Sequence, residues 1–198
     1  MSLHLTLKAG VTSGIIHVVA DIVAQAVETR GQSLTNPAEA HNAERTKRFA
    51  LVGLTLHGPF FQRGFALVDK RFGAPTSMRV VMKKTLAVQV FLNPPYMLLL
   101  FSYLGLLEGR RGDEVLQNTK DKFMPAFWAG NVFWPIANFL NFRFLGPQYR
   151  VAYVASCGAV WNTFISMLNQ RYNRQQQQHN NDNGKLTIAN NEDEDAQN

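Results

Sequence analysis

The chain has 198 residues, of which 46% are hydrophobic and 17% charged, and its formal net charge is +6 at pH 7. This length fits a single domain, and the lone cysteine, Cys157, excludes an internal disulfide and a cysteine-based metal site. The mean hydropathy of −0.14 conceals a division, because residues 28–47 and 171–198 carry most of the polar side chains. The remainder has the composition of a membrane protein.

Two apolar segments come first in the chain, residues 5–27 and 49–68. The first carries Lys8, His17 and Asp21 among its polar side chains, and the second carries His57, Gln62 and Arg63. A charge at mid-membrane costs roughly 3 kcal/mol on insertion scales unless a partner or a wet cavity compensates for it. We expect both segments to be helices of a bundle, joined by a polar loop.

Three later segments, residues 85–107, 123–142 and 151–168, have no charged side chain. As a helix the first would be about 34 Å long, enough for a hydrocarbon core of about 30 Å. The sequence therefore predicts an all-α fold, an integral membrane bundle of four to five transmembrane helices over residues 1–170. The Gln- and Asn-rich residues 171–198 are expected to form a disordered tail.

Prolines interrupt two of these segments, with Pro94 and Pro95 in residues 85–107 and Pro125 and Pro135 in residues 123–142. Each proline removes a backbone hydrogen bond and is expected to kink its helix. In lipid, the freed carbonyl groups need a neighbouring helix or water. The kinks could serve packing alone, or one of them could be a hinge that gates a cavity.

Polar side chains recur within the spans at steps of three, four or seven residues, which places each set on one helix face. The candidates for these polar stripes are His17, Asp21, Gln25, Arg63, Gln89, Asn93, Asn131, Asn138, Asn141 and Asn162. The stripes either line a water-filled path or hydrogen-bond between helices without water. For Asp21 the alternatives are pore lining and a buried ion pair with Arg63, Arg143 or Arg150.

Two further patterns carry less information. Gly10 and Gly14 have the Gly-x-x-x-Gly spacing that permits close contact between helices. Basic residues are nearly balanced between the two ends of the five expected spans, so the positive-inside rule predicts no orientation.

No motif for catalysis occurs in the sequence: there is no paired-histidine zinc motif, no phosphate-binding glycine loop and no nucleophile elbow. We therefore expect no enzymatic activity, no metal and no cofactor. The basic charge could suggest a nucleic-acid partner. However, the aromatic residues concentrate in uncharged runs instead of interleaving with bases on one face, so we expect no direct contact with nucleic acid.

With these residues in view, the chain resembles the Mpv-seventeen / peroxisomal membrane protein family of organellar integral membrane proteins. The resemblance extends from about Gly14 to Met167. The matching positions are Asp21, Gln25, Arg45, Gly58, Pro59, Lys84, Gln89, Pro94, Trp134, Pro135, Asn141, Phe142, Arg150, Trp161 and Asn162. The chain departs from the family pattern at Ala20, where the family has glycine, and at Val88, where it has aspartate.

The resemblance implies a helical protein of the mitochondrial inner membrane, or alternatively of a peroxisome-type membrane. It also implies a weakly selective channel for small solutes, linked to metabolite homeostasis, mitochondrial DNA maintenance and control of reactive oxygen species. The partners would be membrane lipid and small solutes, and a homo-oligomer is left open. A non-conducting membrane scaffold that organises other inner-membrane proteins is the alternative, in which every polar stripe joins helices.

Overall fold

The computed structural model of the protein describes residues 3–29, 41–161 and 163. Every regular element in this part of the chain is a helix, and none of its residues forms a strand. The expected all-α fold is therefore confirmed. Asn162 and the segment 171–198 lie outside the described residues.

The elements combine into long helical stretches. α1 covers Leu3–Thr29, and the next stretch runs through α2 (Ala43–Leu51), η2 (Val52–His57) and α3 (Gly58–Phe72). The third runs through α4 (Met78–Ala87), η3 (Val88–Leu92) and α5 (Asn93–Leu107). It is followed by α6 (Gly112–Phe144) and by a final helical segment, residues 150–161.

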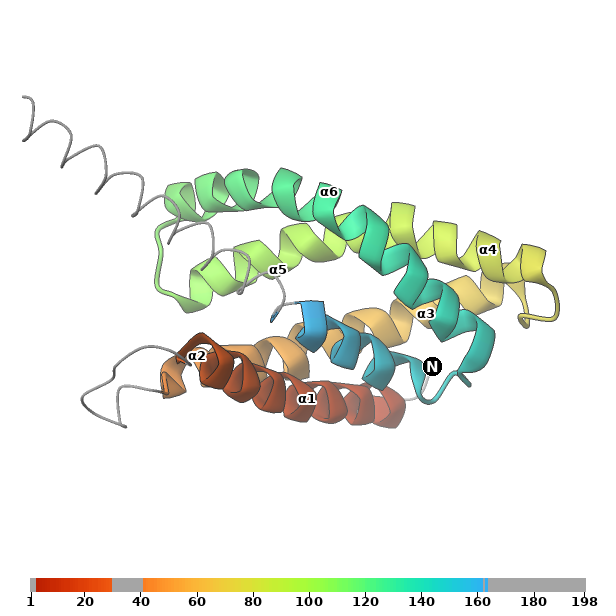
Figure 1. The fold of residues 1–198 in the computed structure, drawn as a ribbon, viewed down its shortest axis with the longest axis horizontal. Coiled ribbons are helices and arrows are strands. Elements are labelled where there is room, and N and C mark those ends of the chain that lie inside the picture. Colours follow the sequence, from red (N-terminus) through yellow and green to blue (C-terminus); the bar gives the residue numbers. More distant parts are fainter. Residues whose placement is uncertain (1–2, 30–40, 162, 164–198) are drawn as a thin grey trace, which may run out of the picture.

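Successive stretches run antiparallel, so the turns gather at two ends of the molecule (Figure 1). The Arg45 end holds the start of α2 and the turn between α5 and α6. The Asp69 end holds the start of α1, the turn after α3 and the turn at residues 145–149. α1 packs on α2, η2 and α3, while α5 packs on α6. Near the Arg45 end the molecule therefore consists of two hairpins, α1–α2 and α5–α6.

Each π-helical segment, η2 or η3, is separated from a following proline by one residue. The N–H of Gly58 donates to the carbonyl of Gly53, and the N–H of Asn93 donates to the carbonyl of Val88, each five residues back. Pro59 and Pro94 follow immediately and have no N–H to donate. The wider π turn lets each helix continue past its proline. Both prolines and π turns commonly bend a helix locally. Pro125 and Pro135 lie inside α6, which is continuous but curves along its length (Figure 1).

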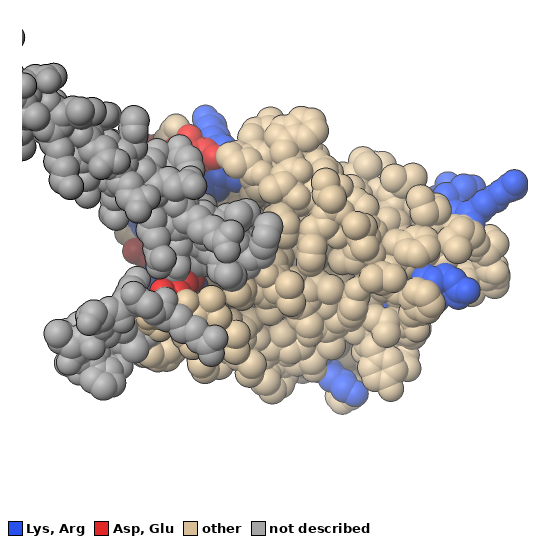
Figure 2. All heavy atoms as spheres, in the orientation of Figure 1, with Lys and Arg blue, Asp and Glu red and all other residues tan. Residues whose placement is uncertain are grey.

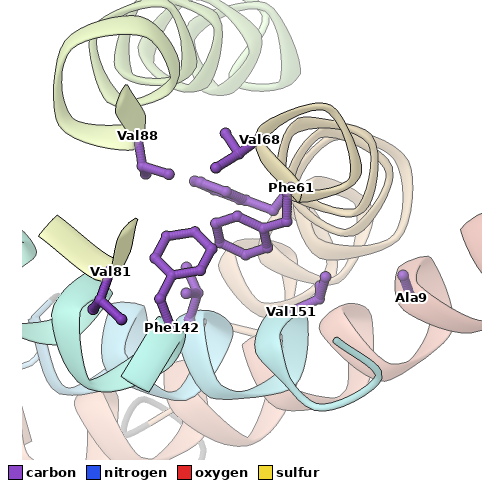
Figure 3. Close-up of a cluster of buried hydrophobic side chains, with 9 residues drawn as sticks. Ala9, Phe61, Val68, Val81, Val88, Phe142 and Val151 are labelled. Carbon is purple, nitrogen blue, oxygen red and sulfur yellow. The ribbon is translucent and has the colours of Figure 1, made fainter. Parts of the chain in front are cut away.

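A hydrophobic core fills the half of the bundle nearer the Asp69 end. It is built from Phe61 and Phe65 of α3, Val81 of α4, Phe142 of α6 and Val154 of the final segment, each at most 4% exposed. Figure 3 shows Phe61, Phe142, Val81 and Val88 converging from different helices. The rings of Phe65 and Phe142 meet edge to face, with centroids 5.6 Å apart. This half of the bundle is closed by direct packing.

The outer faces of the helices carry large, exposed apolar side chains. They include Leu7, Ile15, Val19, Leu67, Leu86, Val90, Phe91, Leu99, Val132, Ile136 and Val160. Charged residues gather toward the two ends, and the surface between them is largely free of charge on the face shown (Figure 2). By length and composition, Leu3–Thr29 and Met78–Leu107 are able to cross a membrane. The number of four to five spanning helices stays a prediction.

Glycines bring α1 and the η2–α3 junction into backbone contact. A Cβ atom built on Gly53 would lie 2.7 Å from the Cα of Gly14, and one built on Gly58 would lie 2.5 Å from the Cα of Gly10. Only glycine allows this approach, since the nearest atoms belong to the opposite backbone. The spacing of Gly10 and Gly14 thus marks a real helix contact.

We expect Gly58→Ala to destabilise the protein by about 1–3 kcal/mol, the usual range for overpacking a close contact. The added methyl group would meet the backbone of Ala9 and Gly10, and neither can move without shifting α1. Unfolding of the purified protein in mixed micelles measures the effect.

Gly112→Ala is the matched control, because nothing lies within 4 Å of a Cβ atom at Gly112. Equal stability of the two variants would show that α1 and α3 are not held in this contact.

Candidate functional site

A cavity of about 250 Å³ lies between the two hairpins, on the Arg45 side of the hydrophobic core. Its polar side chains are His17 of α1, His57 of η2, and Asn93 and Tyr96 of α5. Its remaining walls are apolar or aromatic: Phe49, Phe61, Met97, Leu100, Phe101, Leu104, Ala126, Trp134, Gly158 and Trp161. A few polar groups in an otherwise apolar enclosure are typical of a site that holds small molecules.

The two cavity histidines are held in place through Ser13. The Nδ1 atom of His17 donates to the backbone carbonyl of Ser13 at 2.8 Å, and the Nδ1 atom of His57 lies 2.7 Å from the Ser13 hydroxyl. The ring centroids are 4.8 Å apart, and the ring of Tyr96 lies 5.5 Å from that of His57. A neutral His17 that donates through Nδ1 has an unprotonated Nε2, which is a hydrogen-bond acceptor.

A dense polar network lies next to the cavity at the Arg45 end. Asp21 is buried and forms an ion pair with Arg45, with 2.8 Å between Oδ1 and Nε. Its Oδ2 accepts hydrogen bonds from Gln25 and from Thr46, both at 2.6 Å. Arg45 also binds Glu28 through two bonds of 2.7 and 3.0 Å. A pocket of about 20 Å³ lined by His17, Asp21 and Arg45 separates this network from the cavity.

The ion pair of Asp21 corrects the sequence interpretation, which offered Arg63, Arg143 or Arg150 as partners. The partner is Arg45, which lies beside Asp21 because α1 and α2 are antiparallel and in contact. The signal that could have found it is the polar face shared by Asp21, Gln25 and Glu28 near the end of α1, opposite the start of α2.

The amides of η3 and α6 bind each other. The side chain of Gln89 donates to Asn131 at 2.6 Å and accepts from Asn93 at 2.8 Å. These bonds join η3 and α6, so Gln89 and Asn131 act between helices, as one of the two sequence interpretations proposed. Of the three, Asn93 also lines the cavity.

Asn138 and Asn141 are buried deeper in α6, with exposed fractions of 1% and 0%. They do not line the cavity between the hairpins. The Oδ1 atoms of both, and the Nδ2 of Asn141, have no hydrogen-bond partner among the described residues. The sequence predicted correctly that these amides face the interior, and their role as pore lining stays a prediction.

A second ionic cluster closes the Asp69 end. The carboxylate of Asp69 binds Lys84 at 2.6 Å and Arg150 at 2.6 and 2.8 Å. Lys84 and Arg150 are 0% and 2% exposed, and Arg150 stacks over the ring of Phe142 with 4.9 Å to the centroid. Sequence analysis offered Arg150 as one possible partner of Asp21, and this was wrong because Asp69 binds Arg150 at the opposite end of the bundle.

Arg63 is also not where the sequence interpretation put it. It is exposed on the outer face of α3, beside Pro59, Leu67 and Phe91, and does not line the cavity. Arg63 therefore does not line a path through the centre of the bundle.

The remaining motif residues support the site from the surrounding helices. Gly58 and Pro59 form the junction after η2, and Pro94 begins α5 after η3. Pro135 lies within α6 next to Trp134, which faces Trp161 across the cavity with ring centroids 6.3 Å apart.

Comparison with known proteins places the chain in a family. Residues 105–166 match the Mpv17 / PMP22 family. The chain is 32% identical to mitochondrial inner membrane protein Mpv17 of Drosophila melanogaster, over 64% of this chain and 76% of that protein. The chain belongs to the Mpv17 / PMP22 family.

Other relatives cover more of the chain. PXMP2/4 family protein 4 of Dictyostelium discoideum is 28% identical over 82% of this chain and 85% of its own length. Mitochondrial inner membrane protein Mpv17 of Danio rerio is 28% identical over 79% of this chain and 85% of its own length. No solved structure matches the chain. The chain is accordingly an all-α protein of the mitochondrial inner membrane.

We expect Asp69→Asn to destabilise the protein by about 3–5 kcal/mol, because it leaves Lys84 and Arg150 buried without an anion. Denaturant unfolding in micelles measures the change. Asp113→Asn is the control, since Asp113 is exposed in the first turn of α6 and should cost no more than about 1 kcal/mol. Similar losses for the two variants would contradict the structural importance of the cluster at the Asp69 end.

Proposed function

We propose that the protein is a weakly selective channel for small solutes in the mitochondrial inner membrane, and that this structure is its closed conformation. The observation that carries the proposal is the cavity of about 250 Å³ between the two hairpins, with His17, His57, Asn93 and Tyr96 on its wall. At about 30 Å³ per molecule in the liquid, it has room for on the order of eight waters or one small metabolite.

The wall chemistry supports weak selectivity. Strong discrimination between solutes needs rings of fixed charge or closely fitted carbonyl groups. The lining of this cavity is instead aromatic and aliphatic, with an amide, a phenol and two imidazoles. Such groups exchange hydrogen bonds with many solutes, and solute size would be the main criterion for passage.

Two barriers close the proposed path. Phe61, Phe65 and Phe142 fill the bundle between the cavity and the Asp69 end. At the other end, Asp21 and Arg45 hold α1 against α2. A conducting conformation would have to open both, so α3 would have to move away from α6 at the phenylalanine core, and α1 would have to move away from α2 at the Arg45 end.

In this membrane the channel would support metabolite homeostasis, and through it mitochondrial DNA maintenance and control of reactive oxygen species. The proposal gives the chain no catalytic role and no cofactor. In the described residues there is no group of three or more His, Cys, Asp or Glu side chains placed to hold a metal.

A second candidate function is a non-conducting scaffold for other inner-membrane proteins. It is favoured by the bond from Gln89 to Asn131 and by the bond from Gln25 of α1 to Thr46 of α2, since these stripe residues join helices. Under this alternative the cavity holds no passing solute. The following two experiments separate the candidates.

We expect Arg45→Gln to increase solute flux severalfold. The variant removes the ion pairs with Asp21 and Glu28, leaving a buried carboxylate that draws water into the Arg45 end. Swelling of proteoliposomes in polyols of graded size measures the flux. Arg110→Gln, an exposed cation at the same end that binds Glu108, is the matched control and should leave flux unchanged. A scaffold would give no flux in any of the three proteins, provided that each is shown to be folded.

We expect Gly158→Leu to reduce the flux of larger solutes more than that of small ones, because the new side chain would project into the cavity. The position tolerates a Cβ atom, whose nearest neighbour would be the ring of Trp134 at 3.9 Å. Val160→Leu, on the exposed face of the same helical segment, is the control. Equal flux in these two variants would show that solute does not pass through this cavity.

A further inference from the structure

An outer groove of about 430 Å³ lies between the second and third helical stretches, on the face of the molecule away from the cavity. It is lined by Thr55, Pro59, Arg63, Leu67, Phe91 and Pro95, among others. Leu67 and Phe91 are 67% and 72% exposed at its edges. The two junctions after η2 and η3 meet here, and their prolines form part of the groove wall.

Among the described residues that line this groove, Arg63 is the only charged one. It is exposed and has no acidic partner among the residues that the structure describes. An ionisable side chain on a membrane-embedded face is expensive unless a counter-charge or water reaches it. A groove with a bare cation and otherwise apolar walls is therefore complementary to an amphiphile that carries a negative group.

The depth of Arg63 agrees with a phosphate as this negative group. The stretch Ala43–Phe72 would be about 45 Å long, so it would extend about 7 Å beyond each side of a 30 Å hydrocarbon core if centred. Arg63 precedes the end of α3 by about 13 Å along the helix axis, which places it roughly 6 Å below the headgroup boundary. This distance is within reach of a long guanidinium side chain and of a lipid phosphate drawn slightly inward.

The charge around the groove favours an anionic lipid over a zwitterionic one. Besides Arg63, the described basic residues toward this end are Lys8, Lys70, Arg71, Arg79, Lys83, Lys84, Arg143 and Arg150. Asp69 is the single described acidic residue there, and Lys84 and Arg150 occupy its carboxylate. On the face shown in Figure 2, this end of the molecule carries blue side chains and no red ones. In a phosphocholine headgroup the ammonium offsets the attraction of the phosphate, whereas a headgroup with net negative charge would be attracted.

We propose that this groove binds an anionic phospholipid of the bilayer, whose phosphate pairs with Arg63 and whose acyl chain lies against Leu67 and Phe91. The guanidinium can bind a phosphate through two parallel N–H bonds, which an ammonium cannot do. Lys70 and Arg71, about two turns C-terminal of Arg63, add attraction toward the headgroup region. The site is separate from the solute path and does not depend on conduction.

The test is lipid binding to the full chain in detergent, with phosphatidylglycerol and a tail-matched phosphatidylcholine as probes and native mass spectrometry as the readout. We expect phosphatidylglycerol to bind the wild-type protein more tightly than phosphatidylcholine. Arg63→Gln should weaken phosphatidylglycerol binding about fivefold, the equivalent of about 1 kcal/mol per basic residue near an anionic surface. Arg63→Lys should recover part of the loss.

Lys83→Gln is the matched control, because it removes an exposed cation from the same end and does not line the groove. Equal weakening by Lys83→Gln and Arg63→Gln would overturn the proposal in favour of diffuse attraction. Equal binding of the two lipids to the wild-type protein would also overturn it. A third overturning result would be competition by glycerol 1-phosphate as effective as that by intact lipid, since this would indicate a site for a soluble anion. Weaker binding in Phe91→Ala would support the acyl-chain contact, and unchanged binding would count against it.

Discussion

A bilayer solvates the outer faces of these helices, so polar side chains within the spans have to find their partners inside the bundle. Toward each end of the bundle, one carboxylate provides such a partner for several polar side chains. Asp21 binds Arg45, Gln25 and Thr46, and Asp69 binds Lys84 and Arg150. Between the two clusters, the interior divides into a closely packed half and a hollow half. The hydrophobic effect does not drive helices together in lipid, and these bonds, with the glycine contact between α1 and the η2–α3 junction, take over that role.

The sequence predicted the helices well because uncharged runs long enough to cross a membrane have few other ways to satisfy their backbone. It underestimated their lengths. α6 begins at Gly112, not at residue 123, and the second stretch begins at Ala43, not at residue 49. The point where charged residues stop in the sequence marks the edge of the membrane's hydrocarbon core. A helix extends beyond that point until it reaches its capping residues. Asn42, for example, caps α2 by accepting from the N–H of Arg45 at 2.9 Å.

The sequence predicted which polar residues lie inside the bundle, but not which of them contact each other. Periodicity correctly indicated that Asp21, Asn93 and Asn138 face inward, since burial follows the helical repeat. Which residues meet depends on how far neighbouring helices are shifted and rotated, and a single sequence does not contain that information. Asp69 was missed because it precedes Lys70 and Arg71, and a run of charges at a helix end is usually a solvated boundary.

The π-helical segment η2 has a geometric consequence for everything that follows it in the chain. A π segment amounts to one residue added to an α-helix. Without that residue, α3 would turn by about 100° around its axis relative to α2. Phe61 and Phe65 would then leave the interior, and the carboxylate of Asp69 would point away from Lys84 and Arg150. The orientation of half the bundle is therefore set by one wide turn, and a single-residue deletion within 52–57 would disturb the distant ionic cluster without altering any of its members.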